Sequence, residues 1–113
     1  MDWTTIEESV TYTDYVTFSS GVTVTNASAY KILPNVVIFT YDIYATLAPG
    51  QNVVGATTSK VTQVTWGSGR ITTSGSSQNC ATCQALSNGG QFRIMSPAAA
   101  VASTGTIMLI VNG

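Results

Sequence analysis

The sequence predicts an all-β protein, a two-sheet antiparallel β-sandwich of jelly-roll or immunoglobulin-like topology with about seven or eight short strands. Threonine and apolar residues alternate with a period of two over much of the first two thirds of the chain, which is typical of half-buried strands. Clusters of Gly, Pro, Ser and Asn separate these stretches, and no stretch has the pattern of an amphipathic helix. With 113 residues, the chain is expected to form one domain over residues 1–113, with residues 1–9 as a candidate extended arm.

The first expected strand covers residues 10–18, where apolar and hydroxyl side chains point to opposite faces. Asp14 interrupts the apolar face, which indicates an edge position or a bend. A turn at residues 19–21 and a short strand at residues 22–25 follow, and residues 26–30 are expected to be a connection.

The clearest strand is residues 36–47, which begins after the turn signal Pro34-Asn35 and ends at Ala48-Pro49-Gly50-Gln51. Both of its faces are partly apolar, so this strand is expected to be central in the sheet.

Two further strands, residues 62–66 and 70–73, flank Gly67-Ser68-Gly69, which is typical of a three-residue hairpin loop. Residues 74–90 are rich in Gly, Ser, Asn and Gln and are expected to form a long polar loop. Neutral polar side chains are dense there, and loops often carry binding residues. The candidate binding residues in this loop are Ser76, Gln78, Asn79, Gln84 and Asn88.

Residues 91–95 are expected to return as a strand, and residues 98–102 to form one helical turn or an extended segment. The last strand, residues 106–111, is apolar at every position but its first. Such a run is expected to be buried on both faces, inside the domain or inside an oligomer. We expect it to be an assembly strand, with Ile107, Met108, Leu109, Ile110 and Val111 as its contact residues.

The scarcity of ionisable side chains limits the function more than any motif does. The chain has four Lys and Arg, five Asp and Glu and no histidine, so only 8% of its residues are charged. A Ser–His pair is impossible, and no catalytic, cofactor-binding or metal site is predicted, so we expect a protein that is not an enzyme. No basic arm is present for nucleic acid, and the longest apolar run is too short to cross a membrane. A net charge of −1 does little to oppose self-association.

Cys80 and Cys83 form the sharpest local motif, a CxxC in the expected polar loop. A redox pair normally opens a helix, and none is predicted here. Zinc would need two more ligands, for which the chain has no histidine and no other cysteine. A local disulfide or a pair of free thiols is therefore expected.

Asp42 stands in an otherwise apolar and aromatic strand, where a carboxylate must be paired or reach solvent. We expect it to have a structural or interfacial role, either paired with Arg70, Arg93, Lys31 or Lys60 or facing the exposed side of the sheet beside Tyr44. The five tyrosines and two tryptophans are expected to serve mainly as core and cross-strand pairs, or to line an oligomer interface or a glycan groove.

These observations favour a structural subunit of a virus or phage particle, such as a capsid decoration, spike or fibre component, that assembles as a trimer or larger homo-oligomer and contacts another structural protein. A start at an unprocessed methionine without an export signal favours the virus over a secreted filament. The expected location is a virion or an extracellular assembly. The alternatives are a pilus-like filament subunit and a sandwich module that recognises a host-surface glycan or receptor.

Overall fold

The computed structural model describes residues 8–73, 76–87 and 89–112, without the side chains of residues 76–80. In these residues the chain forms nine strands and one short 3-10 turn. They are β1 (Glu8–Val10), η1 (Tyr12–Asp14), β2 (Val16–Phe18), β3 (Thr23–Leu33), β4 (Val36–Leu47), β5 (Gly50–Thr57), β6 (Thr65–Thr73), β7 (Ser76–Ala85), β8 (Gln91–Ser96) and β9 (Ala100–Ile110). The described part of the chain contains no helix long and apolar enough to cross a bilayer.

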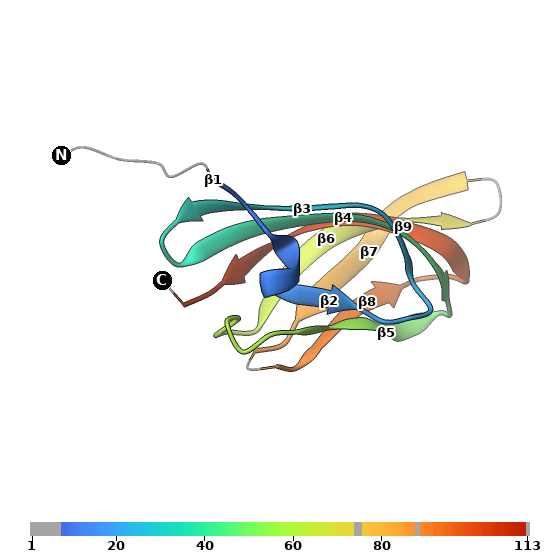
Figure 1. Cartoon of the computed structure of the whole chain (residues 1–113). Coiled ribbons are helices and arrows are strands. Elements are labelled where there is room, and N and C mark those ends of the chain that lie inside the picture. Colours follow the sequence, from blue (N-terminus) through green and yellow to red (C-terminus); the bar gives the residue numbers. More distant parts are fainter. Residues whose placement is uncertain (1–7, 74–75, 88, 113) are drawn as a thin grey trace.

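The strands form a curled antiparallel sheet in the order β1-β3-β4-β9-β6-β7-β8-β5-β2. Figure 1 shows how the curl brings β2, β5 and β8 under β3, β4 and β9, so that two arms of the same sheet face each other. The prediction of an all-β antiparallel protein is confirmed. The finer prediction of two separate sheets in jelly-roll or immunoglobulin order is not confirmed, because the hydrogen-bonded ladder runs through all nine described strands.

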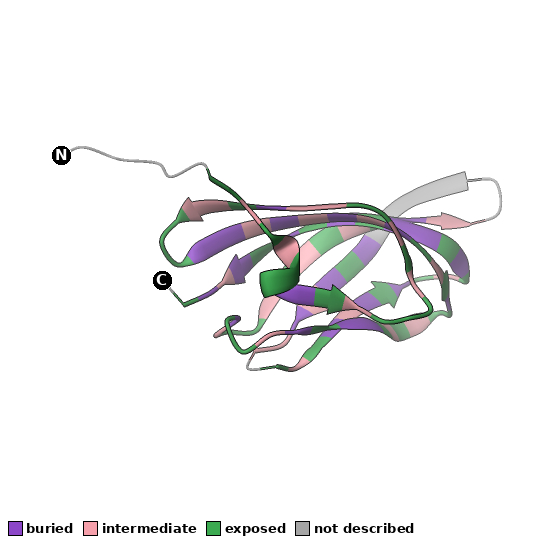
Figure 2. Cartoon of the chain, viewed as in Figure 1, coloured by how far each residue is buried: buried purple, intermediate pink, exposed green. Residues whose placement is uncertain are grey.

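The core lies between the two arms (Figure 2). Its centre is a cluster of aromatic rings from β2, β4 and β8, in which Phe92 meets Tyr41 edge-to-face with ring centroids 5.6 Å apart. Phe39 and Phe18 complete the cluster, each with its centroid about 6 Å from that of Phe92. Edge-to-face pairs of this kind stabilise a core beyond the area they bury.

Strand β4 has the bounds and the central position that the sequence predicts. Val37, Phe39, Tyr41 and Ile43 alternate along its inner face and are almost fully buried. The prediction fits here because β-branched and aromatic residues with a period of two satisfy both the strand backbone and a half-buried surface.

Two predictions in the first third of the chain are wrong. Residues 10–18 are not one strand, since η1 separates β1 from β2 and carries the chain from one edge of the sheet to the other. The bend expected at Asp14 is confirmed, because Asp14 ends η1. Residues 26–30 are part of β3 rather than a connection, because the backbone of β3 pairs with β4 along most of its length.

The hairpin loop predicted at Gly67-Ser68-Gly69 is also wrong, because these residues lie in the middle of the continuous strand β6. Glycine is needed at position 67 for close packing rather than for a turn: an added Cβ would lie 2.7 Å from Cβ of Ile107 and 2.8 Å from Sγ of Cys83. The polar loop predicted at residues 74–90 contains a strand as well, since β7 pairs with β6 and, through residues 82–85, with β8.

At the C-terminal end, β8 confirms the strand predicted at residues 91–95, and β9 confirms and extends the last predicted strand. Of the two alternatives for residues 98–102, the helical turn is wrong, and the extended segment is confirmed for residues 100–102, where β9 begins. The expectation that the last strand is buried on both faces is corrected: Ile107 and Leu109 are buried, whereas Met108 between them is 47% exposed. Strand β9 therefore has one core face and one solvent face.

Candidate functional site

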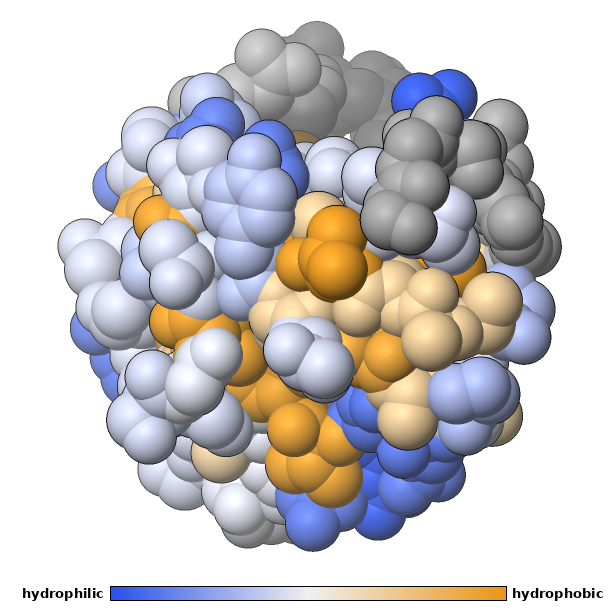
Figure 3. Space-filling view, turned by 90° about the vertical axis from the view of Figure 1, so that its right-hand side faces the viewer, coloured by the Kyte–Doolittle hydropathy of each residue, from blue (hydrophilic) through white to orange (hydrophobic). Residues whose placement is uncertain are grey.

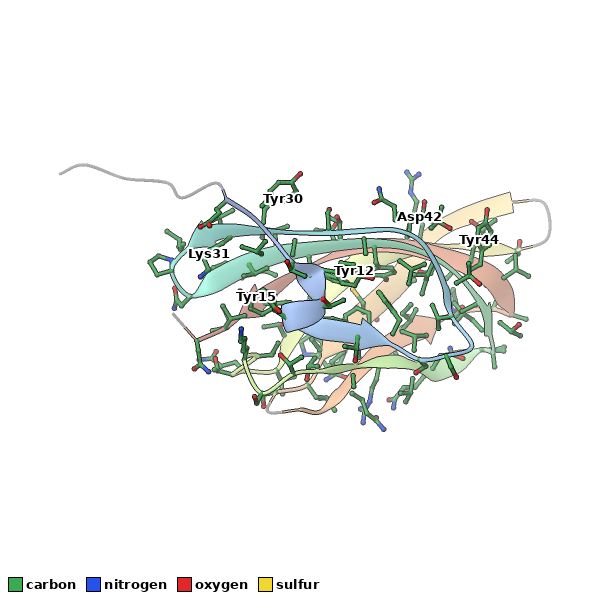
Figure 4. The ribbon with its side chains drawn as sticks, viewed as in Figure 1. Tyr12, Tyr15, Tyr30, Lys31, Asp42 and Tyr44 are labelled. Atoms are coloured by element: carbon green, nitrogen blue, oxygen red, sulfur yellow. The ribbon has the colours of Figure 1, made fainter. Side chains whose placement is uncertain are left out.

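The candidate site is the solvent face of β3, β4, β9 and β6, which we call the outer face. The registers place its side chains in rows that cross the four strands. One row contains Tyr30, Ile38 and Met108, which pair directly across β3, β4 and β9. Trp66 of β6 belongs to the same row, because Gly67 pairs with Ile107 and the next pair along the strands is therefore Trp66 with Met108. We call these four residues the apolar row. Figure 4 shows Tyr30 and Asp42 projecting from the same side of the sheet, away from the core.

The apolar row is exposed over most of its length. Tyr30 is 48% exposed, Met108 47% and Trp66 62%, and Ile38 is half-buried between its neighbours. Leu33, at the end of β3, and Val64, just before β6, extend the exposed apolar surface toward the β3–β4 turn. No charged residue belongs to the row, so this part of the outer face can be covered without desolvating an ion.

Further along the same strands the outer face becomes polar and hollow. A groove of about 660 Å³ lies there, and we call it the polar groove. Its floor is formed by backbone at Gly69 and Gly105, beside Tyr41. Its walls carry an amide, a carboxylate, a guanidinium and four hydroxyls, contributed by Asn26, Asp42, Arg70, Thr40, Ser68, Thr104 and Thr106.

Asp42 and Arg70 face the groove from β4 and β6, with Thr104 of β9 paired to both. The hydroxyl of Thr104 donates to Oδ1 of Asp42 at 3.3 Å. Of the two alternatives expected from the sequence, the second is confirmed: Asp42 lies on the solvent side of the sheet, on the same face as Tyr44, and its hydrogen-bond partner is a hydroxyl. Tyr44 lies beside the groove, two residues further along β4 on the same face, and is 57% exposed (Figure 4).

A second apolar surface lies at the end of the molecule where β9 begins (Figure 3). Val101, the second residue of β9, is half exposed, and nearby small residues such as Ala45 and Ala98 pack partly buried against the core.

Beneath the polar groove the sheet buries two ionisable groups. The hydroxyl of Tyr41 is buried and makes no hydrogen bond with normal geometry, and burial strongly raises its pKa. Burial also raises the pKa of Cys83, whose Sγ donates to the carbonyl of Thr106 at 3.9 Å. Both groups are therefore neutral at physiological pH, and Cys83 has the environment of an inert thiol.

Cys83 is a free, buried cysteine. The side chain of Cys80 lies outside the described residues, but the backbone of both positions belongs to the extended strand β7. The local disulfide and the pair of free thiols therefore both stay predictions for Cys80.

We expect the buried pair to make the protein sensitive to alkali. Unfolded Cys and Tyr titrate near 9.0 and 10.0, and both pKa values are raised in the folded state. Above about pH 9 the unfolded chain thus binds fewer protons than the folded one, so stability is complete below that pH and falls as pH rises. Urea unfolding at a series of pH values measures this decline. In Cys83→Ala the decline is expected to begin about one pH unit later, where Tyr41 alone acts; an identical profile in both proteins would contradict the assignment to Cys83.

Of the binding residues proposed from the sequence, the structure describes the side chain of Gln84 alone. Gln84 is half-buried on β7, while the side chains of Ser76, Gln78 and Asn79, and all of Asn88, lie outside the described residues. Sequence reasoning identified Asp42, Met108 and the aromatic set, but it missed the alignment of Asn26, Thr104 and Arg70 across the sheet. Only the strand order and register supply that alignment.

Among the described residues no three His, Cys, Asp or Glu side chains gather as metal ligands. Comparison with protein-family models, with curated proteins and with solved structures found no match.

Proposed function

We propose that this chain is a non-enzymatic structural subunit that associates with copies of itself through the apolar row. The observation that carries the proposal is the row itself, in which three large exposed side chains and the half-buried Ile38 stand beside one another on four neighbouring strands. Single exposed apolar side chains are common on monomers, whereas a contiguous apolar patch is typical of a surface that binds another protein. Tyr, Trp and Met are also the residue types enriched in such interfaces.

A second copy of this chain is the partner that the composition favours. A two-fold contact places the same row on both sides, so apolar residues meet apolar residues without any further complementarity. The chain carries a net charge of only −1, and therefore little repulsion opposes the approach of two copies.

We place this subunit in a virus or phage particle, as a capsid decoration, spike or fibre component that forms a trimer or larger homo-oligomer and contacts another structural protein. Neutral, hydroxyl-rich strands support this setting, because close subunit packing then buries few charges. The absence of histidine from the sequence and its charged fraction of 8% support a role without catalysis. An extracellular filament built from the same subunit is the alternative setting.

The substitution Met108→Glu tests the proposed contact. It places a carboxylate in the middle of the apolar row, where a partner copy would have to bury it. We therefore expect the dissociation constant of the assembly to rise at least tenfold, which corresponds to roughly 1.4 kcal/mol or more. Light scattering coupled to size-exclusion chromatography measures the mass over a range of concentrations. Negative-stain microscopy of the same fractions distinguishes a closed ring from a filament.

Met95→Glu is the matched control. Met95 is 40% exposed on a strand of the opposite arm, so the same change is made at similar exposure but outside the apolar row. The control protein is expected to keep the mass of the unmodified chain. A monomeric unmodified protein at every concentration, or equal dissociation in both variants, would count against the proposal.

A further inference from the structure

We infer that the polar groove binds a neutral oligosaccharide. The first argument is the chemistry of its walls. The side chains that line this groove of about 660 Å³ carry hydroxyls, one amide, one carboxylate and one guanidinium, and none of them is Val, Leu, Ile or Met. Pockets for apolar small molecules are lined mainly by hydrophobic side chains. A ligand that is itself dense in hydroxyl groups, each both a donor and an acceptor, matches this lining better.

The charges that face the groove predict a ligand without net charge. Asp42 and Arg70 lie on either side of Thr104, about two strand spacings or roughly 10 Å apart. An anionic ligand that extends across the groove would meet the carboxylate, and a cationic one would meet the guanidinium. A sugar satisfies both groups, because its hydroxyls donate to Asp42 and accept from Arg70.

Tyr44 supplies the apolar contact that a sugar ring needs. Its side chain is 57% exposed and lies on the same face as Asp42, about 7 Å along the strand. A pyranose ring has one face made largely of C–H groups, which packs against the flat face of an aromatic ring. Tyr44 contributes no ring to the aromatic core cluster, so packing inside the domain does not explain its position.

The groove is also preorganised. Its walls rise from β3, β4, β9 and β6, which are neighbours in the sheet, and its floor is backbone at Gly69 and Gly105 supported from the core side by the buried Tyr41. Such a site loses little conformational freedom when a ligand binds.

The test is a titration of the full chain with a panel of defined oligosaccharides, followed by two-dimensional amide NMR. The neutral panel contains hexasaccharides of cellulose, xylan, mannan, β-1,3-glucan and chitin, together with a neutral mannose-rich N-glycan, so that polysaccharide and glycoprotein sources are distinguished. Heparin and polygalacturonate fragments form the charged panel. At least one neutral member is expected to shift the amide signals of groove residues such as Thr104, Gly105 and Arg70.

Matched variants locate the site and report folding in the same spectra. Asp42→Asn and Tyr44→Ala are each expected to weaken binding by at least about tenfold, because each removes a main contact. Met95→Ala and Arg93→Gln, which change an exposed apolar side chain and a cation on the opposite arm, are expected to leave binding unchanged.

Three outcomes would overturn the inference: no shift with any neutral oligosaccharide at millimolar concentration, binding of the charged panel alone, or equal weakening by the groove variants and their controls. The result is independent of the proposed self-association, because the mass of the assembly is measured separately and depends on Met108 in the apolar row. If a monomeric protein binds sugar, the proposed self-association is wrong and the sugar site stands. If the protein assembles but binds no sugar, the sugar site is wrong and the self-association stands.

Discussion

A chain that ends at Ile107 is expected to lose cooperative folding. Its truncation removes Leu109, which is fully buried, and Val111, which is 3% exposed and bridges to Val61. Loss of one such buried side chain costs about 2–5 kcal/mol, and a domain of this size is stable by only about 5–15 kcal/mol. The truncation also leaves the start of β4 without its hydrogen-bonded neighbour, because Val36 and Val37 pair with Ile110 and Leu109. Backbone groups left without hydrogen bonds in the middle of a sheet lower the stability of the folded protein further.

A chain shortened only by residues 112–113 is the control for this truncation. Asn112 is exposed, and its N–H donates to the carbonyl of Lys60 at 3.0 Å, so this shorter deletion is expected to fray the end without unfolding the sheet. Circular dichroism during urea titration compares the two proteins. A cooperative transition in the chain that ends at Ile107, close to that of the control, would show that the last three residues of β9 are dispensable.

Local sequence patterns predicted the fold correctly where the residues of one strand are enough to define its ends and its buried face. Strand β4 is the clearest case, because alternating apolar residues between two turn signals define both its ends and its core face. The bend at Asp14 was predictable for a related reason, since a carboxylate cannot continue an apolar face into the core.

The middle of strand β6 and the whole of strand β7 were not predicted, because the contacts that make them strands come from distant parts of the sequence. The glycines of β6 resemble a hairpin loop locally, yet Gly67 is required by the side chains of Ile107 and Cys83 on two neighbouring strands. The polar composition of β7 resembles a loop, yet this strand pairs with β6 on one side and β8 on the other. Backbone pairing with distant strands overrides a weak local preference.

The candidate site was predictable residue by residue but not as a surface. Asp42 and the tyrosines stand out in the sequence, whereas the rows that bring Tyr30 to Met108, or Asp42 to Thr104, depend on the order β3-β4-β9. A shift of one residue in any of these registers would turn that strand's outer residues toward the core. Register over a long sequence separation is set by the packing of the whole core, which a single sequence does not display.

Gly105→Ala is expected to destabilise the protein by about 2–3 kcal/mol, although alanine is otherwise preferred to glycine in a strand. A Cβ at this position would collide with the Tyr41 hydroxyl and would lie 2.7 Å from Cζ and 2.9 Å from Cε1 of the same ring. The ring cannot retreat easily, because Tyr41 is 2% exposed and meets Phe92 edge-to-face. Urea unfolding of the variant and the unmodified chain measures the difference.

Two companion variants separate this collision from a general effect of adding a methyl group. Gly21→Ala is the matched control, since nothing lies within 4 Å of its added Cβ, and its stability is expected to change by less than about 0.5 kcal/mol. Tyr41→Phe removes a buried hydroxyl that has no hydrogen-bond partner, so we expect it to be neutral or slightly stabilising. Because that hydroxyl is also the first atom the new methyl group meets, the double variant Gly105→Ala/Tyr41→Phe should recover part of the lost stability. Full additivity of the two changes would mean that the cost at Gly105 arises somewhere other than this contact.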